Sequence, residues 1–330
     1  MKLEFLEKLS NADGIASNEG EVRKVLYDEL KDYADEVSCD NLGSIIFKKG
    51  NSGPKIMICA HMDEVGFIVR SISDMGQVML MHVGGVKPLA QFMQRVRITT
   101  EDGRKIHGII QATYDNGSAT KVYVDLGADN AQEVYALGIK EGDMVTYTTE
   151  FEQFAIDGCV AGKAFDDRLG CFIMGEVLKR LKDKKHPNTV YMVGTSSEEV
   201  GIRGAKTAVY KVNPDIVLPI DVACFQDEFV RNHTNRRQIG KGMMQTNFDR
   251  TLAPNRVLMK YIRQTADRLQ KPLQQDMFNG GGTDGGEAHK SRDGKPTAVA
   301  VFQFVMDTVH IPLRSCRIFR MRLISLRRSS

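Results

Sequence analysis

Hydrophobic residues near the start of the chain follow first a helical and then a strand-like spacing. Four apolar residues between positions 22 and 30 recur at helical spacing, just after Asn18 and Glu21, which have the spacing of a capping box. Short apolar stretches separated by polar turns come next. They predict strands over residues 44–48, 55–60 and 66–70.

Residues 71–155 are rich in strand-like stretches and have a helical period only near residues 130–137. Within this part, residues 95–100 and 105–111 flank Asp102-Gly103, a pair that strongly favours a hairpin.

The spacing changes again after Ala161. A helix capped by Asp166 or Asp167 is expected to run to Leu181. A second helix is expected over residues 256–269, and strands are expected over 189–194 and 215–220. Strands that alternate with helices on both sides of an all-β part predict an α/β fold. We therefore expect one α/β domain, formed by residues 1–66 and 156–330, interrupted by a β-rich insertion over residues 67–155.

Composition excludes several broad classes. Hydrophobic residues make up 42% and charged residues 26% of the 330 positions, which argues against disorder. The apolar runs are far shorter than the roughly 20 residues of a membrane helix, and the first residues do not resemble a secretion signal. The six cysteines form no Cys-x-x-Cys pair, so we expect reduced thiols and a cytoplasmic protein that does not bind membranes.

The net charge of +3 does not indicate nucleic-acid binding, because the excess is confined to the last residues. Six arginines follow Asp307 and no acidic residue does, so the rest of the chain holds 39 basic and 42 acidic residues. We expect no nucleic-acid partner.

Candidate chemistry lies where predicted strands end. One strand runs into His61 and Asp63, another into Glu198 and Glu199, and a third into Asp221. In an open α/β sheet, ligands bind beyond the carboxyl ends of the strands. Asp166, at the start of a helix, can join the same site.

One imidazole with several carboxylates and no thiolate suits Zn²⁺, Co²⁺ or Mn²⁺. Two metals about 3.5–4 Å apart need a carboxylate between them, and Asp166 is our candidate for that bridge. Such a pair activates water for amide hydrolysis, and either Glu198 or Glu199 could take the proton while the other binds metal.

Each of these residues alone has a simpler structural explanation, such as a surface pair, a solvated glutamate or a helix cap. The metal hypothesis rests on their conjunction at four separate strand or helix ends. A glycosidase is disfavoured because adjacent glutamates rarely flank a bond from about 5–9 Å apart.

A glycine-rich stretch over residues 279–286, NGGGTDGG, lacks the spacing of a phosphate-binding loop. It is either a tight turn or a wall of the substrate pocket. His233 and His289 are weaker candidates for pocket residues.

Five motifs together resemble the glutamyl-aminopeptidase, or TET-type, family of dinuclear metallo-aminopeptidases, and most closely its broad-specificity enterobacterial members. The motifs run in the family's order and spacing: AHMDEVGF (60–67), GKAFDDRLG (162–170), SSEEVGIRGA (196–205), PIDVA (219–223) and GGTDGGEAH (281–289).

The resemblance implies a zinc-peptidase-like catalytic domain with a mixed sheet, and a PDZ-like or barrel-like insertion that forms dimers. It also implies assembly of such dimers into tetrahedral dodecamers. It further implies an aminopeptidase that uses two divalent ions, most often Zn²⁺ or Co²⁺, to remove N-terminal residues from short peptides.

Carried over by motif, His61 and Asp221 bind one metal, Asp166 bridges, and Glu199 binds the second metal. Glu198 corresponds to the general base, and Asp63 to the acid that orients His61. The resemblance thus assigns roles to the two glutamates that spacing left open.

The chain departs from the family after Val301. The family needs another histidine on the second metal, whereas this chain continues as FQFVMDTVHIP and then the arginine-rich residues. Codons for that segment, read in another frame, can encode VPVRHGHCAHS, which resembles the missing motif. We therefore hypothesise a frameshift near Val301, with the ligand histidine falling where Asp307-Thr308 stand and His310 present by chance.

Two other functions remain open at this point. One is an N-acyl-amino-acid deacylase of the same fold, which would act on blocked rather than free amino groups. The other is a catalytically impaired assembly subunit, because the altered end removes one metal ligand.

Overall fold

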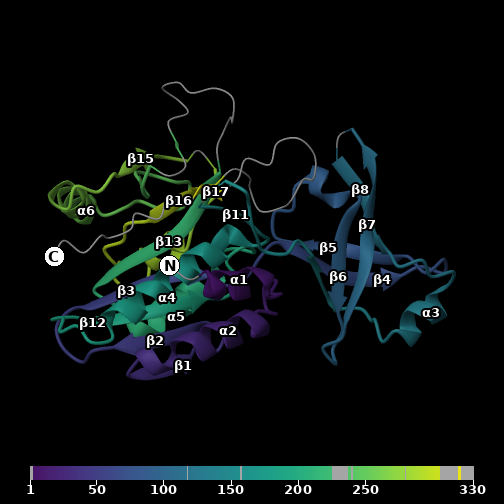
Figure 1. Ribbon diagram of the computed structural model, residues 1–330, viewed down its shortest axis with the longest axis horizontal. Helices are drawn as coiled ribbons and strands as arrows, with labels where there is room; N and C mark the ends of the chain where they lie inside the picture. The colour runs from purple at the N-terminus through teal and green to yellow at the C-terminus, as the bar shows by residue number, and fades with distance from the viewer. Residues whose placement is uncertain are drawn as a thin grey trace.

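An eight-stranded mixed sheet and a six-stranded antiparallel barrel make up this mixed α/β fold (Figure 1). The computed structural model describes residues 3–116, 118–156, 158–224, 237–238, 241–278, 280–304 and 319–320. In Figure 1 the barrel lies to the right of the sheet and its helices.

The predicted strands and helices occur in the predicted order along the chain. The large sheet contains, in spatial order, β1 (Glu36–Cys39), β2 (Ile45–Lys49), β12 (Thr189–Thr195), β3 (Lys55–His61), β13 (Ile216–Cys224), β16 (Ala300–Phe304), β14 (Met244–Thr246) and β15 (Gln274–Asp276). The helices beside it are α1 (Glu4–Asn11), α2 (Gly20–Leu30), α4 (Phe165–Leu181), α5 (Arg203–Val212), α6 (Arg256–Arg268) and α7 (Gly285–Ala288). A small antiparallel sheet joins β10 (Glu152–Gln153), β11 (Cys159–Ala161) and β17 (Phe319–Arg320). Single 3₁₀ turns lie at Lys31–Tyr33 and Pro88–Gln91.

Helices cover both faces of the large sheet because its strands alternate apolar side chains between the two faces. On β2, Ile45 and Phe47 pack with residues of α1, α2 and α4. Ile46, between them, packs instead with Ala208 and Val209 of α5. At the centre of the sheet, β3 pairs in parallel with both β12 and β13. The residues that follow these three strands therefore lie at the same edge of the sheet.

The insertion is a closed barrel in the strand order β4 (Gly66–Ile72), β5 (Val78–Val83), β8 (Ser118–Asp125), β7 (Lys105–Asp115), β6 (Gln94–Thr99) and β9 (Met144–Tyr147). The predicted hairpin is confirmed, since Thr99 pairs with Lys105 across Asp102-Gly103. The short helix α3 (Ala131–Ala136) lies where the helical period predicted it, and Asn130 caps it by accepting from the Glu133 N–H.

The predicted capping box before α2 is wrong. The helix begins at Gly20, and its N-cap residue, Glu19, makes no capping hydrogen bond through its side chain. Glu21 instead accepts hydrogen bonds from the Asp13 N–H and from Lys105 of the barrel. Contacts with distant segments therefore replace the local cap.

A buried set of charges joins the barrel to the α1–α2 connection. Asp13 has no exposed surface, and it pairs with Arg97 at 2.6 Å and Lys105 at 2.7 Å, both from the barrel. Lys163, which precedes α4, lies 3.0 Å from the same carboxylate. Asp13 thus links three segments that are far apart in the sequence.

Among the described residues, no helix has both the length and the apolar character needed to cross a membrane. Within the segment for which a frameshift is hypothesised, Asp307, Thr308 and His310 lie outside the described residues.

Candidate metal centre

The carboxyl ends of the central strands lie side by side. Thr195, which ends β12, pairs with His61, which ends β3. Because Leu218 of β13 pairs with Ile58, Asp221 lies level with His61 on the neighbouring strand. Ligand atoms of His61, Asp166 and Glu199 all lie within 4.8 Å of one another. Three of the four predicted metal ligands therefore meet at one point, and Asp221 lies on the adjacent strand.

The His61 ring is held by hydrogen bonds at both nitrogens. Its Nδ1–H donates to the main-chain oxygen of Asp63 at 2.9 Å, while the Asp63 carboxylate is 3.6 Å from Nδ1. This bond leaves Nε2 for a metal ion. In the structure, Nε2 lies 3.0 Å from Oδ1 of Asp166. Burial opposes a charge on His61, but its hydrogen bonds and the surrounding carboxylates raise its pKa well above the ordinary value.

The two carboxylate oxygens of Asp63 accept hydrogen bonds from the main-chain N–H groups of Glu198 and Glu199, at 2.9 and 3.0 Å. Asp63 is fully buried. Its backbone therefore orients the histidine, and its carboxylate fixes the loop that carries both glutamates.

Asp166 and Asp167, at the start of α4, both have non-helical backbone angles, and their carboxylates make different contacts. Asp167 is the residue that caps the helix, since its Oδ1 accepts from the Gly170 N–H at 3.0 Å. Its Oδ2 accepts from the His61 N–H at 3.2 Å. The Asp166 carboxylate is thereby left to face His61.

The carboxylates suit a bound cation. Oε1 of Glu199 is buried and has no hydrogen-bond partner among the described residues. Burial and neighbouring carboxylates raise the pKa values of Glu198, Glu199 and Asp221 well above their ordinary range. A buried carboxylate oxygen without a hydrogen-bond partner, surrounded by other acids, favours a divalent cation, so the donor set fits the metals that the sequence predicts.

Asp284 was not predicted as a site residue, although it lies in the glycine-rich stretch that the sequence singles out. Its Oδ2 accepts a hydrogen bond of 2.5 Å from the Thr195 hydroxyl, and its Oδ1 is buried without a partner among the described residues. Burial raises the pKa of Asp284 to about 6. The carboxyl group of Asp284 is thus buried next to Thr195, the last residue of β12.

The remaining histidine candidates gain no support. His289 Nδ1–H donates to the main-chain oxygen of Gly285 at 2.9 Å, a local helical contact. His233 lies outside the described residues.

A second set of buried contacts holds the residues on either side of Asp63, and the spacing of residues in the sequence did not predict it. Arg168 is fully buried and donates to the main-chain oxygens of Met62, Leu9 and Ala12. Glu64 pairs with Lys163 at 2.5 Å and with Arg168 at 3.2 Å. These buried charges hold the segment that follows His61.

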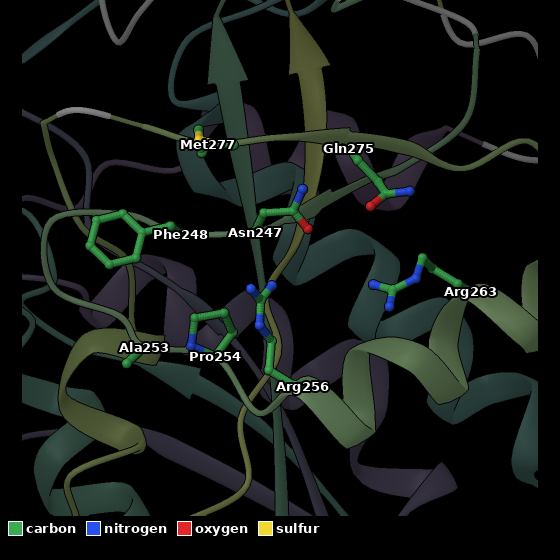
Figure 2. Close-up of a pocket in the computed structure, with 8 residues that line it drawn as sticks. All are labelled: Asn247, Phe248, Ala253, Pro254, Arg256, Arg263, Gln275 and Met277. Atoms are coloured by element: carbon green, nitrogen blue, oxygen red, sulfur yellow. The ribbon is translucent and has the colours of Figure 1, made fainter.

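A separate cavity of about 720 Å³ lies beside α6 (Figure 2). Its lining combines the exposed Phe248 and Met277 with Arg256 and Arg263, and no carboxylate is among the described residues that line it. None of the predicted site residues lines it, so this cavity is separate from the candidate metal centre.

Comparison with known proteins gives consistent results. The family model described as M42 glutamyl aminopeptidase matches residues 43–318. Over 307 residues the chain is 33% identical to the putative aminopeptidase FrvX of Escherichia coli (strain K12), covering 90% of this chain and 85% of that protein.

Solved structures agree with the sequence matches. The TET aminopeptidase from the marine sediment archaeon Thaumarchaeota archaeon SCGC AB-539-E09 superimposes with a TM-score of 0.90 at 35% identity, covering 93% of this chain and 89% of that one. The TET1 peptidase of Pyrococcus horikoshii, which can assemble into a tetrahedron or a large octahedral shell, gives a TM-score of 0.82 at 26% identity, with 93% of each chain covered. The resemblance noted from the motifs is thereby confirmed.

Proposed function

Because the chain belongs to the M42 glutamyl aminopeptidase family of metallopeptidases, we propose that it removes N-terminal residues from short peptides by metal-dependent hydrolysis. The observation that carries this proposal is the convergence of His61, Asp166 and Glu199, together with a buried Glu199 oxygen that has no hydrogen-bond partner among the described residues.

In this proposal His61 and Asp221 would hold one metal ion, Glu199 would hold the second, and Asp166 would serve both. When bound, two such ions polarise the scissile carbonyl and lower the pKa of a coordinated water. The donor set accepts Zn²⁺, Co²⁺ or Mn²⁺.

Glu198 is the proposed general base. Its carboxylate would take a proton from the attacking water and pass it to the leaving amine. Its burial and the neighbouring Asp221 and Asp284 charges raise its pKa in the metal-free chain. Asp63 serves by fixing the main chain at Glu198 and Glu199.

Homo-oligomeric assembly is a second part of the proposal, with dimers building a dodecamer. The named Pyrococcus horikoshii relative supports it, and so does an apolar surface on the barrel. Phe92, Met93 and Tyr114 are exposed there, and the rings of Phe92 and Tyr114 pack edge to face with centroids 6.2 Å apart. We propose that the barrel forms the dimer contact.

We further propose a cytoplasmic location, which the free thiols of the described cysteines support: Cys39, Cys59, Cys159 and Cys171.

The decisive experiment compares an unblocked peptide with its N-acetylated form, each with added Zn²⁺ or Co²⁺ and with a chelator as control. Release of the first residue from the free peptide only, abolished by the chelator, is the expected result. Turnover of the acetylated form alone would identify a deacylase instead. No turnover of either, with assembly intact and fewer than two ions bound per chain, would identify an impaired assembly subunit.

A further inference from the structure

Ser197 immediately precedes the two glutamates of the centre and has a left-handed backbone, with φ of 55°. Residues other than glycine rarely adopt such a conformation, and it persists only when the surroundings impose it. The direction in which Glu198 and Glu199 leave this residue depends on that conformation.

Glu19, from the connection between α1 and α2, imposes it. Its Oε1 accepts from the Ser197 N–H at 2.9 Å and from the Ser197 hydroxyl at 3.3 Å, across 178 residues of chain. Glu19 is only 2% exposed, so water does not replace these bonds. The same oxygen accepts from the Ser17 N–H at 3.1 Å, and this N–H also lies 3.2 Å from the Ser197 hydroxyl oxygen.

Apart from the bond from the Ser17 N–H, the side chain of Glu19 has no local role in its own helix. It stands at the N-cap position of α2 and yet makes no capping bond to that helix. Ser196, one residue earlier, is held by the Ser44 hydroxyl, and Asp63 holds the two residues that follow Ser197. Glu19 completes this series of anchors at its most strained member.

We propose that Glu19 is a positioning residue for the proposed general base Glu198 and the proposed ligand Glu199, acting through Ser197. This inference rests on the proposed function for its kinetic consequence, but its structural consequence concerns metal binding and can be measured separately.

The test compares Glu19→Ala with Glu19→Gln, because glutamine keeps an Oε1 that can accept both bonds from Ser197. For Glu19→Ala we expect kcat to fall about 10- to 100-fold with KM changed less than about threefold, and the visible absorption of the Co²⁺-loaded protein to shift. Glu19→Gln should stay within about threefold of the wild-type kcat.

Thr189→Val is the matched control. It removes another hydroxyl bond, the partly buried one from Thr189 to the Ser52 oxygen, at the opposite end of β12. It should leave kcat and the Co²⁺ spectrum unchanged. If Glu19→Ala does not fold, Glu19→Asp replaces it, since its carboxylate is one methylene short of Ser197 and should also lose kcat.

A kcat and a Co²⁺ spectrum equal to wild type in Glu19→Ala would overturn the proposal. So would a loss in Thr189→Val as large as that in Glu19→Ala. If the wild type hydrolyses no peptide, the proposed function fails while the Co²⁺ spectra still decide whether Glu19 positions the site.

Discussion

Oδ2 of Asp63 accepts a hydrogen bond from the main-chain N–H of Glu199 at 3.0 Å, and these residues are 136 positions apart in the chain. This bond joins the end of β3, which carries His61, to the loop after β12, which carries Glu199. The paired bond from Glu198 at 2.9 Å makes Asp63 a two-point anchor.

Asp63→Asn should therefore reduce kcat about 10- to 100-fold, a size typical of residues that orient metal ligands. Asparagine has one acceptor oxygen in place of two, so one of the two glutamate N–H groups loses its partner in a buried site. The measurement is steady-state kinetics on a free peptide, with the melting temperature recorded alongside. A kcat within twofold of wild type would contradict this role for the Asp63 carboxylate.

The two adjacent glutamates should respond differently to the same substitution. Glu198→Gln removes the proposed base and should lower kcat about 10²- to 10⁴-fold while metal still raises the melting temperature. Glu199→Gln removes a proposed ligand and should reduce that metal-induced rise. The check is a thermal melt with and without Zn²⁺ for each variant. Equal loss of the rise in both variants would show that the two roles are not separated.

The strand ends could be predicted from sequence because they depend on local periodicity. The apolar stretch before His61 identifies a buried strand, and the carboxyl edge of a parallel sheet then brings His61 and Asp221 together whatever the rest of the fold does. The hairpin at Asp102-Gly103 was equally readable, because its turn residues act over a few positions.

The residues that hold the candidate metal centre in place could not be predicted from local periodicity. Glu19 and Ser197 are brought together only by packing of the α1–α2 connection against the loop after β12. The same distant contacts defeated the predicted capping box, because the barrel Lys105 competes for Glu21. Asp284 gave a partial signal through its glycine-rich stretch, but nothing in that stretch indicates Thr195 as its partner.

The charges around Asp13 predict acid sensitivity at the junction with the barrel. Burial opposes the ionisation of Asp13, but Lys163, Arg97 and Lys105 outweigh it and lower its pKa well below the ordinary value. A depressed pKa in the folded state adds stability above the unfolded pKa, near 3.9, and this contribution is lost as pH falls further.

Asp13→Asn should therefore cost roughly 3–5 kcal/mol in the free energy of unfolding at pH 7, because it leaves buried cations without their anion. The difference from wild type should persist down to about pH 4 and narrow below it. Urea unfolding at several pH values measures this. Asp102→Asn is the control, an exposed barrel carboxylate paired with Arg104, and it should change the free energy of unfolding little at any pH. If the difference in unfolding free energy between Asp13→Asn and wild type does not change with pH, the loss of charge pairing is not its cause.

For Asp284 we expect the opposite pH dependence of the unfolding free energy. Its pKa of about 6 in the folded state lies above its unfolded value because the carboxyl group is buried. Between about pH 4 and pH 6 the folded state holds a proton that the unfolded state has lost, so stability falls as pH rises through this window.

Asp284→Asn cannot ionise and should lack this fall. Relative to wild type, the metal-free variant should gain up to about 3 kcal/mol in unfolding free energy between pH 4 and pH 7. Chelator is present throughout, so that bound ions do not alter the charge balance near His61. Asp293→Asn, at an exposed position a few residues further along the chain, should track wild type at every pH. Parallel curves for Asp284→Asn and wild type would show that Asp284 ionises as freely in the folded protein as in the unfolded chain.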